Sequence, residues 1–506
     1  MSTIARVFSA QPDILGASLV SIETDISRGL HSFSVVGLAG KSVEEARDRI
    51  ASAVKHSGFA SPKSKNHKII VSLAPADLKK EGPLFDVPMA LAYLVAAEEI
   101  RFESQTKMFV GELGLDGTIR KIRGALPIAQ AAKREGFSEL FVPHQNVAEA
   151  ALVSDLVVYG ISSLIELIQH LDTQREDHRA LVPASETALP QLWSDTNVRF
   201  EDIRGQESAK RGLIIAAAGR HNSLMIGPPG TGKTMLARAF ESMLPPLSRT
   251  EALEVTAIHS VAGTLLSSPV LTRPPFRAPH HTASHISLVG GGTHPKPGEV
   301  TLAHRGVLFL DEFPEFERRA IDALRQPLED RVVSISRVHS TVVFPADFIL
   351  IAAMNPHRGG FEAGDIHAQV TDDYRKKISG PILDRIDLAL DVSHVKASTL
   401  ADKQQETGET AHAREIILRA RARQTVRFKN TKARSNAEMT ARDIDTLISL
   451  SPSVKILLTT SAERLALSPR SFHRLIKVSR TIADLDDRDD IEEKHLLEAL
   501  QYRIKI

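Results

Sequence analysis

Eight consecutive residues have the composition of a phosphate-binding loop. They are Gly227, Pro228, Pro229, Gly230, Thr231, Gly232, Lys233 and Thr234. The loop follows the apolar run 224–226 and precedes a helix-favouring stretch that starts at Met235. Glycines let backbone amides point at phosphate oxygens, and the following helix adds a favourable dipole. Lys233 supplies a charge for the β- and γ-phosphates and Thr234 a ligand for Mg²⁺, so we expect ATP and Mg²⁺ as cofactors.

A second segment supplies two carboxylates at the end of an apolar strand. Asp311 and Glu312 directly follow the apolar residues 307–310. We assign Asp311 to Mg²⁺ together with Thr234, and Glu312 to the orientation and deprotonation of the attacking water. An Asp-Glu pair after an apolar run is common by itself, but its position downstream of a phosphate loop favours the functional interpretation.

Two further polar residues have a functional and a structural interpretation. Asn355 ends the apolar run 348–354, and ligands of open α/β sheets bind at the carboxyl ends of strands, so Asn355 can reach the γ-phosphate. The alternative is a simple Asn-Pro turn. Arg385 can project toward the γ-phosphate of a neighbouring subunit. The alternative is a surface salt bridge with Asp384 or Asp387.

Composition limits the class of protein. The chain has 506 residues, 42% apolar and 25% charged residues, and a formal net charge of +1. These values predict several soluble, folded domains and neither require nor exclude a nucleic-acid partner. The sequence contains no cysteine, which excludes disulfides, thiolate catalysis and cysteine-ligated metals. Neither a secretory signal at residues 1–20 nor a membrane span is predicted, so we expect a cytoplasmic protein.

Patterning along the chain predicts four consecutive segments. Residues 1–171 alternate strand and helix signals and read as a mixed α/β domain. Residues 172–198 are polar and aperiodic, which favours an exposed linker. Residues 199–395 alternate short buried strands with helices, which predicts a doubly wound parallel sheet. Residues 396–506 show helical periodicity. Within them we predict helix starts at Ser468 with Pro469 and, by a capping box, at Asp490 with Glu493.

The order of these motifs is that of AAA+ ATPases, and four segments identify a narrower resemblance. Residues 276–284, 289–292, 297–300 and 302–307 resemble the magnesium-chelatase-like YifB/ComM proteins, and the likeness extends over nearly the whole chain. The resemblance implies a Lon-protease-like N-terminal domain, a P-loop AAA+ core with a helix-2 insert and a pre-sensor-1 hairpin, and a C-terminal helical lid. It also implies a hexameric ring and a role in unwinding and branch migration of DNA during natural transformation.

The same resemblance implies roles for three residues. Asn355 corresponds to sensor 1, Arg385 to the arginine finger and Arg470 to sensor 2 of the lid. Arg474 and Arg480 lie on the same predicted helix and are alternatives for the sensor 2 role.

Two departures from the family pattern affect the expected function. Leu84 and Leu126 stand where the catalytic serine and lysine of Lon proteases would stand, and a serine–lysine dyad needs both groups, so we predict no peptidase activity. Relatives place cysteines after the Asn355 segment, whereas this chain has His357, Asp365 and His367 there. The spacing of these three residues matches no strong zinc pattern, and we expect them to bind no metal.

Two segments qualify as DNA-contacting pore loops, residues 274–297 and 331–343. The candidate contacts are Arg277, His280, His281, Lys296 and Arg337. Hydrogen-bonded packing within the insert is an equal alternative for His280 and His281. The preferred partner is branched or single-stranded DNA, moved by a homo-oligomeric ring. The alternatives are a chelatase-type motor acting on a metal-insertion protein and a chaperone-like remodeller of a protein client.

Overall fold

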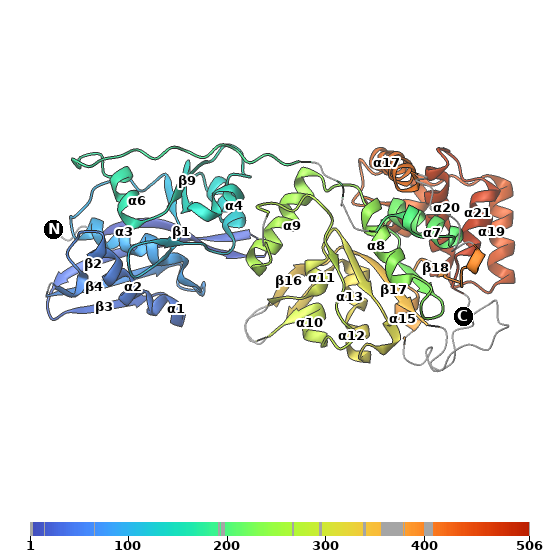
Figure 1. Cartoon of the computed structure of the whole chain (residues 1–506), viewed down its shortest axis with the longest axis horizontal. Coiled ribbons are helices and arrows are strands. Elements are labelled where there is room, and N and C mark those ends of the chain that lie inside the picture. The colour runs from blue at the N-terminus through green and yellow to red at the C-terminus, as the bar shows by residue number, and fades with distance from the viewer. Residues whose placement is uncertain are drawn as a thin grey trace. The chain divides into compact units, whose positions relative to one another are not determined.

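The described residues form two compact units (Figure 1). The computed structural model describes residues 4–14, 16–64, 66–190, 193, 198–265, 268–292, 296–336, 341–355, 378, 380–398 and 408–504. One unit comprises Met1–Pro190 and Arg249–Leu271, and the other comprises Gln191–Ser248 and Thr272–Ile506. Within these described ranges, no helix is both long and apolar enough to cross a membrane.

The first unit is built on a mixed seven-stranded sheet. Its strands, in spatial order, are β3 (Ser32–Val36), β4 (His67–Ala74), β2 (Gly16–Arg28), β1 (Ala5–Asp13), β5 (Lys107–Phe109), β8 (Glu139–Pro143) and β9 (Val157–Ile161). Its longer helices in residues 1–190 are α2 (Ala46–His56), α3 (Asp86–Ala96), α4 (Ala125–Arg134) and α6 (Leu164–Leu171). Helices α3 and α4 pack on β1 and β2. Nine consecutive residues of α3 are buried, because this helix forms the centre of the unit.

The chain returns to this unit after leaving it. Helix α9 (Arg249–Ala262) packs on α4. The Ser260 hydroxyl accepts a hydrogen bond from the Gly124 amide at 2.9 Å and donates one to the buried carboxylate of Glu149. Upstream, the Ala184 amide donates to the Val158 carbonyl of β9 at 2.8 Å, so part of the segment expected to be a linker runs along the sheet edge. The expectation of four consecutive segments did not include this return.

The second unit contains a five-stranded sheet in which every adjacent pair is parallel. Its spatial order is β11 (Phe276–Arg277), β14 (Val307–Leu310), β17 (Ile349–Met354), β10 (Ser223–Ile226) and β18 (Leu388–Asp391). Every residue of β10, β14 and β17 is buried, as expected for strands covered on both faces. This mixed α/β arrangement is consistent with a P-loop AAA+ type fold.

Helices and two hairpins surround this sheet. The helices before residue 400 are α7 (Glu207–Gly219), α8 (Lys233–Met243), α10 (His285–Val289), α11 (Glu299–Leu302), α12 (Arg318–Ala323), α13 (Arg325–Asp330) and α15 (Gly380–Leu383). The hairpins pair β12 (Gly290–Gly291) with β13 (Lys296–Pro297) and β15 (Val332–Ser336) with β16 (Thr341–Pro345). The second hairpin falls in the segment predicted to be one, residues 331–343.

The C-terminal region is helical. It contains α17 (Glu409–Arg427), α18 (Ala441–Leu447), α19 (Pro452–Arg464), α20 (Pro469–Leu485) and α21 (Glu493–Gln501). Ser468 caps α20 through the Ser471 amide, and Pro469 follows it, as predicted. The predicted cap of the last helix was wrong. The N-cap is Glu492, which exchanges hydrogen bonds with His495, because these two residues rather than Asp490 and Glu493 have the required spacing from the helix start.

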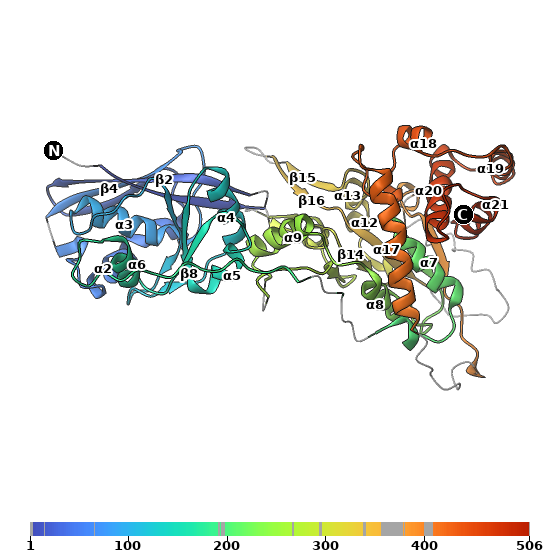
Figure 2. The ribbon, with the colours of Figure 1, turned by 90° about the horizontal axis from the view of Figure 1, so that it is seen from above.

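Side chains of α17 attach the C-terminal helices to the sheet layer. Figure 2 shows α17 beside α7 and α8, and these helices are in contact. Arg421 and Gln424 donate to carbonyls at the end of α7, at 2.7 and 3.0 Å. Arg414 donates to the Ser242 carbonyl near the end of α8 at 2.9 Å. Carbonyls in the last turn of a helix lack partners within the helix, so these contacts cap both helices while holding α17 in place.

A buried carboxylate organises the amino-terminal edge of the five-stranded sheet. Asp347, just before β17, pairs with Arg305 and with Arg220 at 3.1 Å, and Arg331 lies 3.8 Å away. The three arginines have left-handed φ angles of 60°, 63° and 58° for Arg220, Arg305 and Arg331. Burial by itself would raise the pKa of Asp347, but the three arginines outweigh it and hold that pKa well below its usual range. The Asp347 carboxylate therefore links the three loops that contain Arg220, Arg305 and Arg331.

We predict that Asp347→Asn lowers the free energy of unfolding by about 3–5 kcal/mol, because it removes the carboxylate that pairs with the buried Arg305, whereas Arg220 and Arg331 also contact Glu438. Urea denaturation at neutral pH measures the loss, with the exposed Asp445→Asn as a control. A carboxylate whose pKa is lower in the folded than in the unfolded state stabilises the folded protein at pH values above the unfolded-state pKa. This stabilisation is lost as the pH falls toward the folded-state pKa. The difference from wild type should therefore shrink in acid, and equal midpoints at neutral pH would contradict the assignment.

Candidate nucleotide site

Residues 227–232 form the turn between β10 and α8, and Lys233 and Thr234 are the first two residues of α8. Because β10 lies between β17 and β18, the turn starts in the middle of the sheet at its carboxyl edge. Gly230 and Gly232 have φ angles of 78° and 91°, in the left-handed region that favours glycine. A Cβ at Gly227 would lie 2.0 Å from the Val392 carbonyl oxygen. The backbone that follows β18 therefore approaches so closely that only glycine fits at this position.

Lys233 lies inside the turn, in contact with neutral oxygens. Its Nζ donates to the carbonyls of Gly227 and Pro228, each at 2.7 Å, and to the Asn355 side-chain oxygen at 3.0 Å. Burial lowers the pKa of Lys233, and the nearby Asp311 opposes part of that shift. None of the three hydrogen-bonding oxygens carries a charge, so an anionic phosphate is the chemical complement of this ammonium group. Asn355 thus lies beside Lys233, the residue expected to bind phosphate.

Thr234 and Asp311 meet at the same edge. The Thr234 hydroxyl donates to Asp311 Oδ2 at 2.8 Å, and the Glu312 amide donates to Asp311 Oδ1 at 2.9 Å. Magnesium bound with a nucleotide takes one or two protein oxygens, phosphate oxygens and water, without a dedicated protein cage. No cluster of three or more metal-ligating side chains occurs in the ranges that the structure describes. A hydroxyl and a carboxylate beside a phosphate-binding loop fit Mg²⁺ held in this way.

The carboxylate of Glu312 contacts His281, for which the sequence left DNA contact and packing within the insert as equal alternatives. Glu312 has a φ of 50° and begins the short turn of residues 313–315. Its Oε2 lies 2.9 Å from Nδ1 of His281. His281 follows β11, the parallel neighbour of β14, so both residues stand at the carboxyl edge of adjacent strands. The loop after β11 therefore touches the residue expected to orient the attacking water.

The other candidate DNA contacts in the insert have different surroundings. Arg277 forms a bidentate ion pair with Glu299 of α11, at 2.6 and 2.9 Å. The His280 ring lies 4.1 Å from the His281 ring at an interplanar angle of 34°, and its Nδ1 lies 2.9 Å from the Thr282 hydroxyl. Arg277 thereby connects β11 to α11, and the two histidines form one pair.

Two of the insert candidates, His280 and Lys296, are exposed. Lys296 projects from the β12–β13 hairpin into solvent. Arg337, the candidate in the β15–β16 hairpin, lies outside the described residues, as do His357, Asp365 and His367. DNA contact by these side chains stays a prediction.

Arg385 lies at the opposite edge of the sheet from the nucleotide loop. Strands β10 and β18 are parallel and in register from Ser223–Leu388 to Ile226–Asp391. The loop follows Ile226, whereas Arg385 precedes Leu388. Four strand residues span about 13 Å, so Arg385 cannot reach the loop of its own subunit. Its partner is Glu329 of α13, not the neighbouring Asp384 or Asp387 that the sequence offered as the alternative.

Arg470, at the start of α20, lies beside Arg385. Its Nη2 is 3.0 Å from Glu329 Oε1, while Arg385 pairs with Oε2 of the same carboxylate. Arg474, one turn further along α20, donates to the Asp384 carbonyl. All four residues of this group, Glu329, Arg385, Arg470 and Arg474, line a cavity of about 790 Å³.

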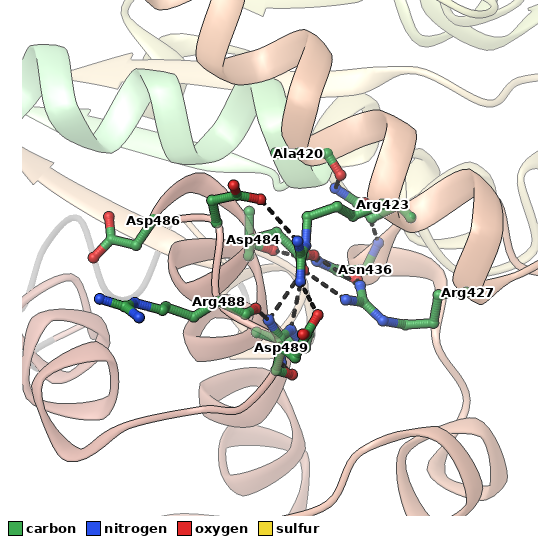
Figure 3. A network of polar contacts seen from close by, with 12 residues as sticks. Ala420, Arg423, Arg427, Asn436, Asp484, Asp486, Arg488 and Asp489 are labelled. Carbon is green, nitrogen blue, oxygen red and sulfur yellow. Dashed lines mark hydrogen bonds and ion pairs between the residues drawn. The ribbon is translucent and has the colours of Figure 1, made fainter.

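Arg480, the other alternative for sensor 2, is buried in a structural network. Figure 3 shows Asp484 surrounded by Arg423, Arg427 and Asn436. Arg427 and Asn436 donate to Asp484 at 2.7 and 2.8 Å, and Arg480 donates to it at 3.2 Å. Arg480 is 3% exposed. Its guanidinium is committed to the interior of the helical region, which leaves Arg470 and Arg474 as the arginines of α20 at the cavity.

Two contacts at these edges were missed by sequence reasoning. No motif marks Glu329, because its helix α13 has only six residues and its partners lie more than fifty residues away. The contact between His281 and Glu312 was also missed, although the parallel pairing of their strands could have suggested it once β11 was recognised.

Comparison with known proteins gives matches over most of the chain. Residues 199–400 match the family "Magnesium chelatase, subunit ChlI". Residues 22–146 match "Subunit ChlI of Mg-chelatase", and residues 407–503 match "Magnesium chelatase, subunit ChlI C-terminal".

Individual relatives extend the likeness to the full length. The chain is 41% identical over 509 residues to "Competence protein ComM" of Haemophilus influenzae, covering 100% of this chain and 98% of the relative. It is 40% identical over 496 residues to YifB of Escherichia coli, covering 97% and 95%. Similarity to the "Magnesium-chelatase 38 kDa subunit" of Rhodobacter capsulatus is 28% over 190 residues, covering 34% and 53%.

We predict that Lys233→Ala weakens ATP binding by about 10- to 100-fold, because it removes the ammonium group that complements the phosphates. Titration with a fluorescent ATP analogue measures the loss, with the exposed Lys455→Ala as a matched control. Thermal unfolding of the variant should resemble that of wild type. Unchanged affinity in a folded Lys233→Ala protein would contradict the assignment of this loop.

Proposed function

This chain belongs to the YifB/ComM family of magnesium-chelatase-like AAA+ proteins, and we propose that it is an ATP-hydrolysing motor that acts as a hexameric ring on branched or single-stranded DNA. The observation that carries the proposal is the separation of Lys233 and Arg385 to opposite edges of one parallel sheet. A subunit with this arrangement offers a nucleotide loop on one side and arginines on the other. Each ATP site is then completed by two subunits.

The loop side supplies binding and water activation. In the proposed reaction Lys233 holds the β- and γ-phosphate oxygens, and Thr234 and Asp311 hold Mg²⁺. The metal, when bound, neutralises charge on the phosphates. Glu312 orients the attacking water and accepts its proton, while Asn355, 3.0 Å from the lysine, contacts the γ-phosphate as sensor 1.

The opposite side supplies charge in trans. Arg385 as arginine finger and Arg470 as sensor 2 stabilise the negative charge that develops on the γ-phosphate of the neighbouring subunit. Support comes from their placement, because both guanidinium groups face one carboxylate at the same cavity. Arg385 and Arg470 are distant in the sequence, but their guanidinium groups lie at the same carboxylate, Glu329.

DNA enters the proposal through the family resemblance, which links YifB/ComM proteins to branch migration. The exposed Lys296 on the β12–β13 hairpin is a suitable phosphate contact. The loop that leads into this insert also carries His281, whose Nδ1 lies 2.9 Å from Glu312. DNA that moves the insert would therefore also move His281 relative to the Glu312 carboxylate.

We assign the remaining regions in the same way. The first unit is proposed to be the Lon-like domain, and α17–α21 the lid. Leu84 and Leu126, at the positions of the protease dyad, are buried apolar residues. This supports a unit that does not cleave peptide bonds.

We predict that DNA stimulates ATP hydrolysis by the purified protein several-fold, with a four-way junction more effective than duplex or single-stranded DNA. Glu312→Gln, which keeps the shape of the side chain but cannot accept the proton, provides the blank. Hydrolysis that ignores every DNA but rises with an unfolded polypeptide would replace this proposal with that of a protein remodeller. A rate equal to the blank under all conditions would reject both.

A further inference from the structure

Glu329 holds both proposed trans-acting arginines at once. Its Oε1 accepts from Arg470 at 3.0 Å, and its Oε2 pairs with Arg385. The three residues come from α13, from α20 and from the turn before β18, so the contact joins three separate elements. One carboxylate thus occupies the space between two guanidinium groups, which is the arrangement that a phosphate would adopt there.

Charges of both signs surround this group, because Asp384 and Asp387 also line the cavity. Arg474 and Lys477 line the same cavity. Burial, followed by the nearby Arg470 and Arg325, lowers the pKa of Arg385. Without an anion between them, Arg385 and Arg470 would repel each other. The carboxylate therefore keeps two like charges together in an isolated subunit.

Water reaches the Arg470 half of this contact, whereas the side chain of Arg385 is only 13% exposed. The side chains of Glu329 and Arg470 are 49% and 48% exposed. Ion pairs with this exposure contribute little to stability, because water competes for both partners. A phosphate group offers the same bidentate geometry with more negative charge. A carboxylate and a phosphate cannot share the two arginines without repulsion, so binding of one displaces the other.

We propose that Glu329 is a placeholder for the γ-phosphate of the ATP bound by the neighbouring subunit, an inference that rests on the proposed function. In the free subunit, Glu329 keeps Arg385 and Arg470 in position and lowers the charge of the group from +2 to +1. When subunits meet, the γ-phosphate must displace Glu329 before the arginines close on it. ADP lacks this phosphate, so ring closure depends on ATP and fails with ADP.

The test compares assembly as a function of ATP concentration. Glu312→Gln prevents hydrolysis, and mass photometry or sedimentation counts rings as Mg-ATP or Mg-ADP is added. Adding Glu329→Gln to this background removes the competing charge but keeps the size of the side chain. It should lower the ATP concentration for half-maximal assembly by about three- to tenfold and permit assembly in ADP. Glu463→Gln, an exposed residue of α19, is the matched control and should shift neither curve.

Other results would contradict either the placeholder role of Glu329 or the proposed ring. If Glu329→Gln left the assembly curves unchanged, the placeholder role would be overturned. If it raised the ATP concentration needed for assembly, the placeholder role would also be overturned, and Glu329 would be a residue that only positions the arginines. Glu329→Ala repeats the comparison without any hydrogen-bonding group and must shift in the same direction. Failure of the Glu312→Gln background to assemble at any ATP concentration would instead overturn the proposed ring, and the placeholder role with it.

Discussion

Two adjacent parallel strands determine how this protein can use ATP. In β10 and β18 the backbones run in the same direction and in register, so the residues that follow one strand and those that precede the other lie at opposite edges. The phosphate-binding loop must follow β10, because only there do a buried strand and a helix N-terminus place amides around a phosphate. Arg385 must precede β18. In the proposed function, this geometry gives each subunit two unlike half-sites, and two neighbouring subunits together form a complete site.

Other contacts join the elements that meet at these edges. At the arginine edge, Asp347 joins the connections that lead into three elements of the sheet layer. At the other edge, the register of β14 with β17 brings the carboxylates beside the loop. Contacts of α17 with the ends of α7 and α8 hold the C-terminal helices against the same sheet, and with them the start of α20 that carries Arg470.

Local patterns predicted much of this second unit, whereas contacts between distant residues could not be predicted. Strands near 223–226, 306–310 and 348–353 were predicted because fully buried strands read as short apolar runs. Lys233 and Asn355 were placed in one site because strand ends meet at one edge, and they lie 3.0 Å apart, although their roles stay predictions. The return of α9 to the first unit and the pairing of Glu329 depend on tertiary packing. No periodicity or spacing in the sequence encodes either.

The most direct test of completion between subunits is to mix two inactive variants. Glu312→Gln subunits keep their arginines, and Arg385→Ala subunits keep a working loop. In a mixed ring, an interface between the loop of an Arg385→Ala subunit and the arginines of a Glu312→Gln neighbour is intact. Equal mixing should make about one interface in four intact and restore ATP hydrolysis that neither variant shows alone. If mixed rings form but remain as inactive as the separate variants, or if Arg385→Ala alone is fully active, each subunit would not depend on its neighbour and the account would be wrong.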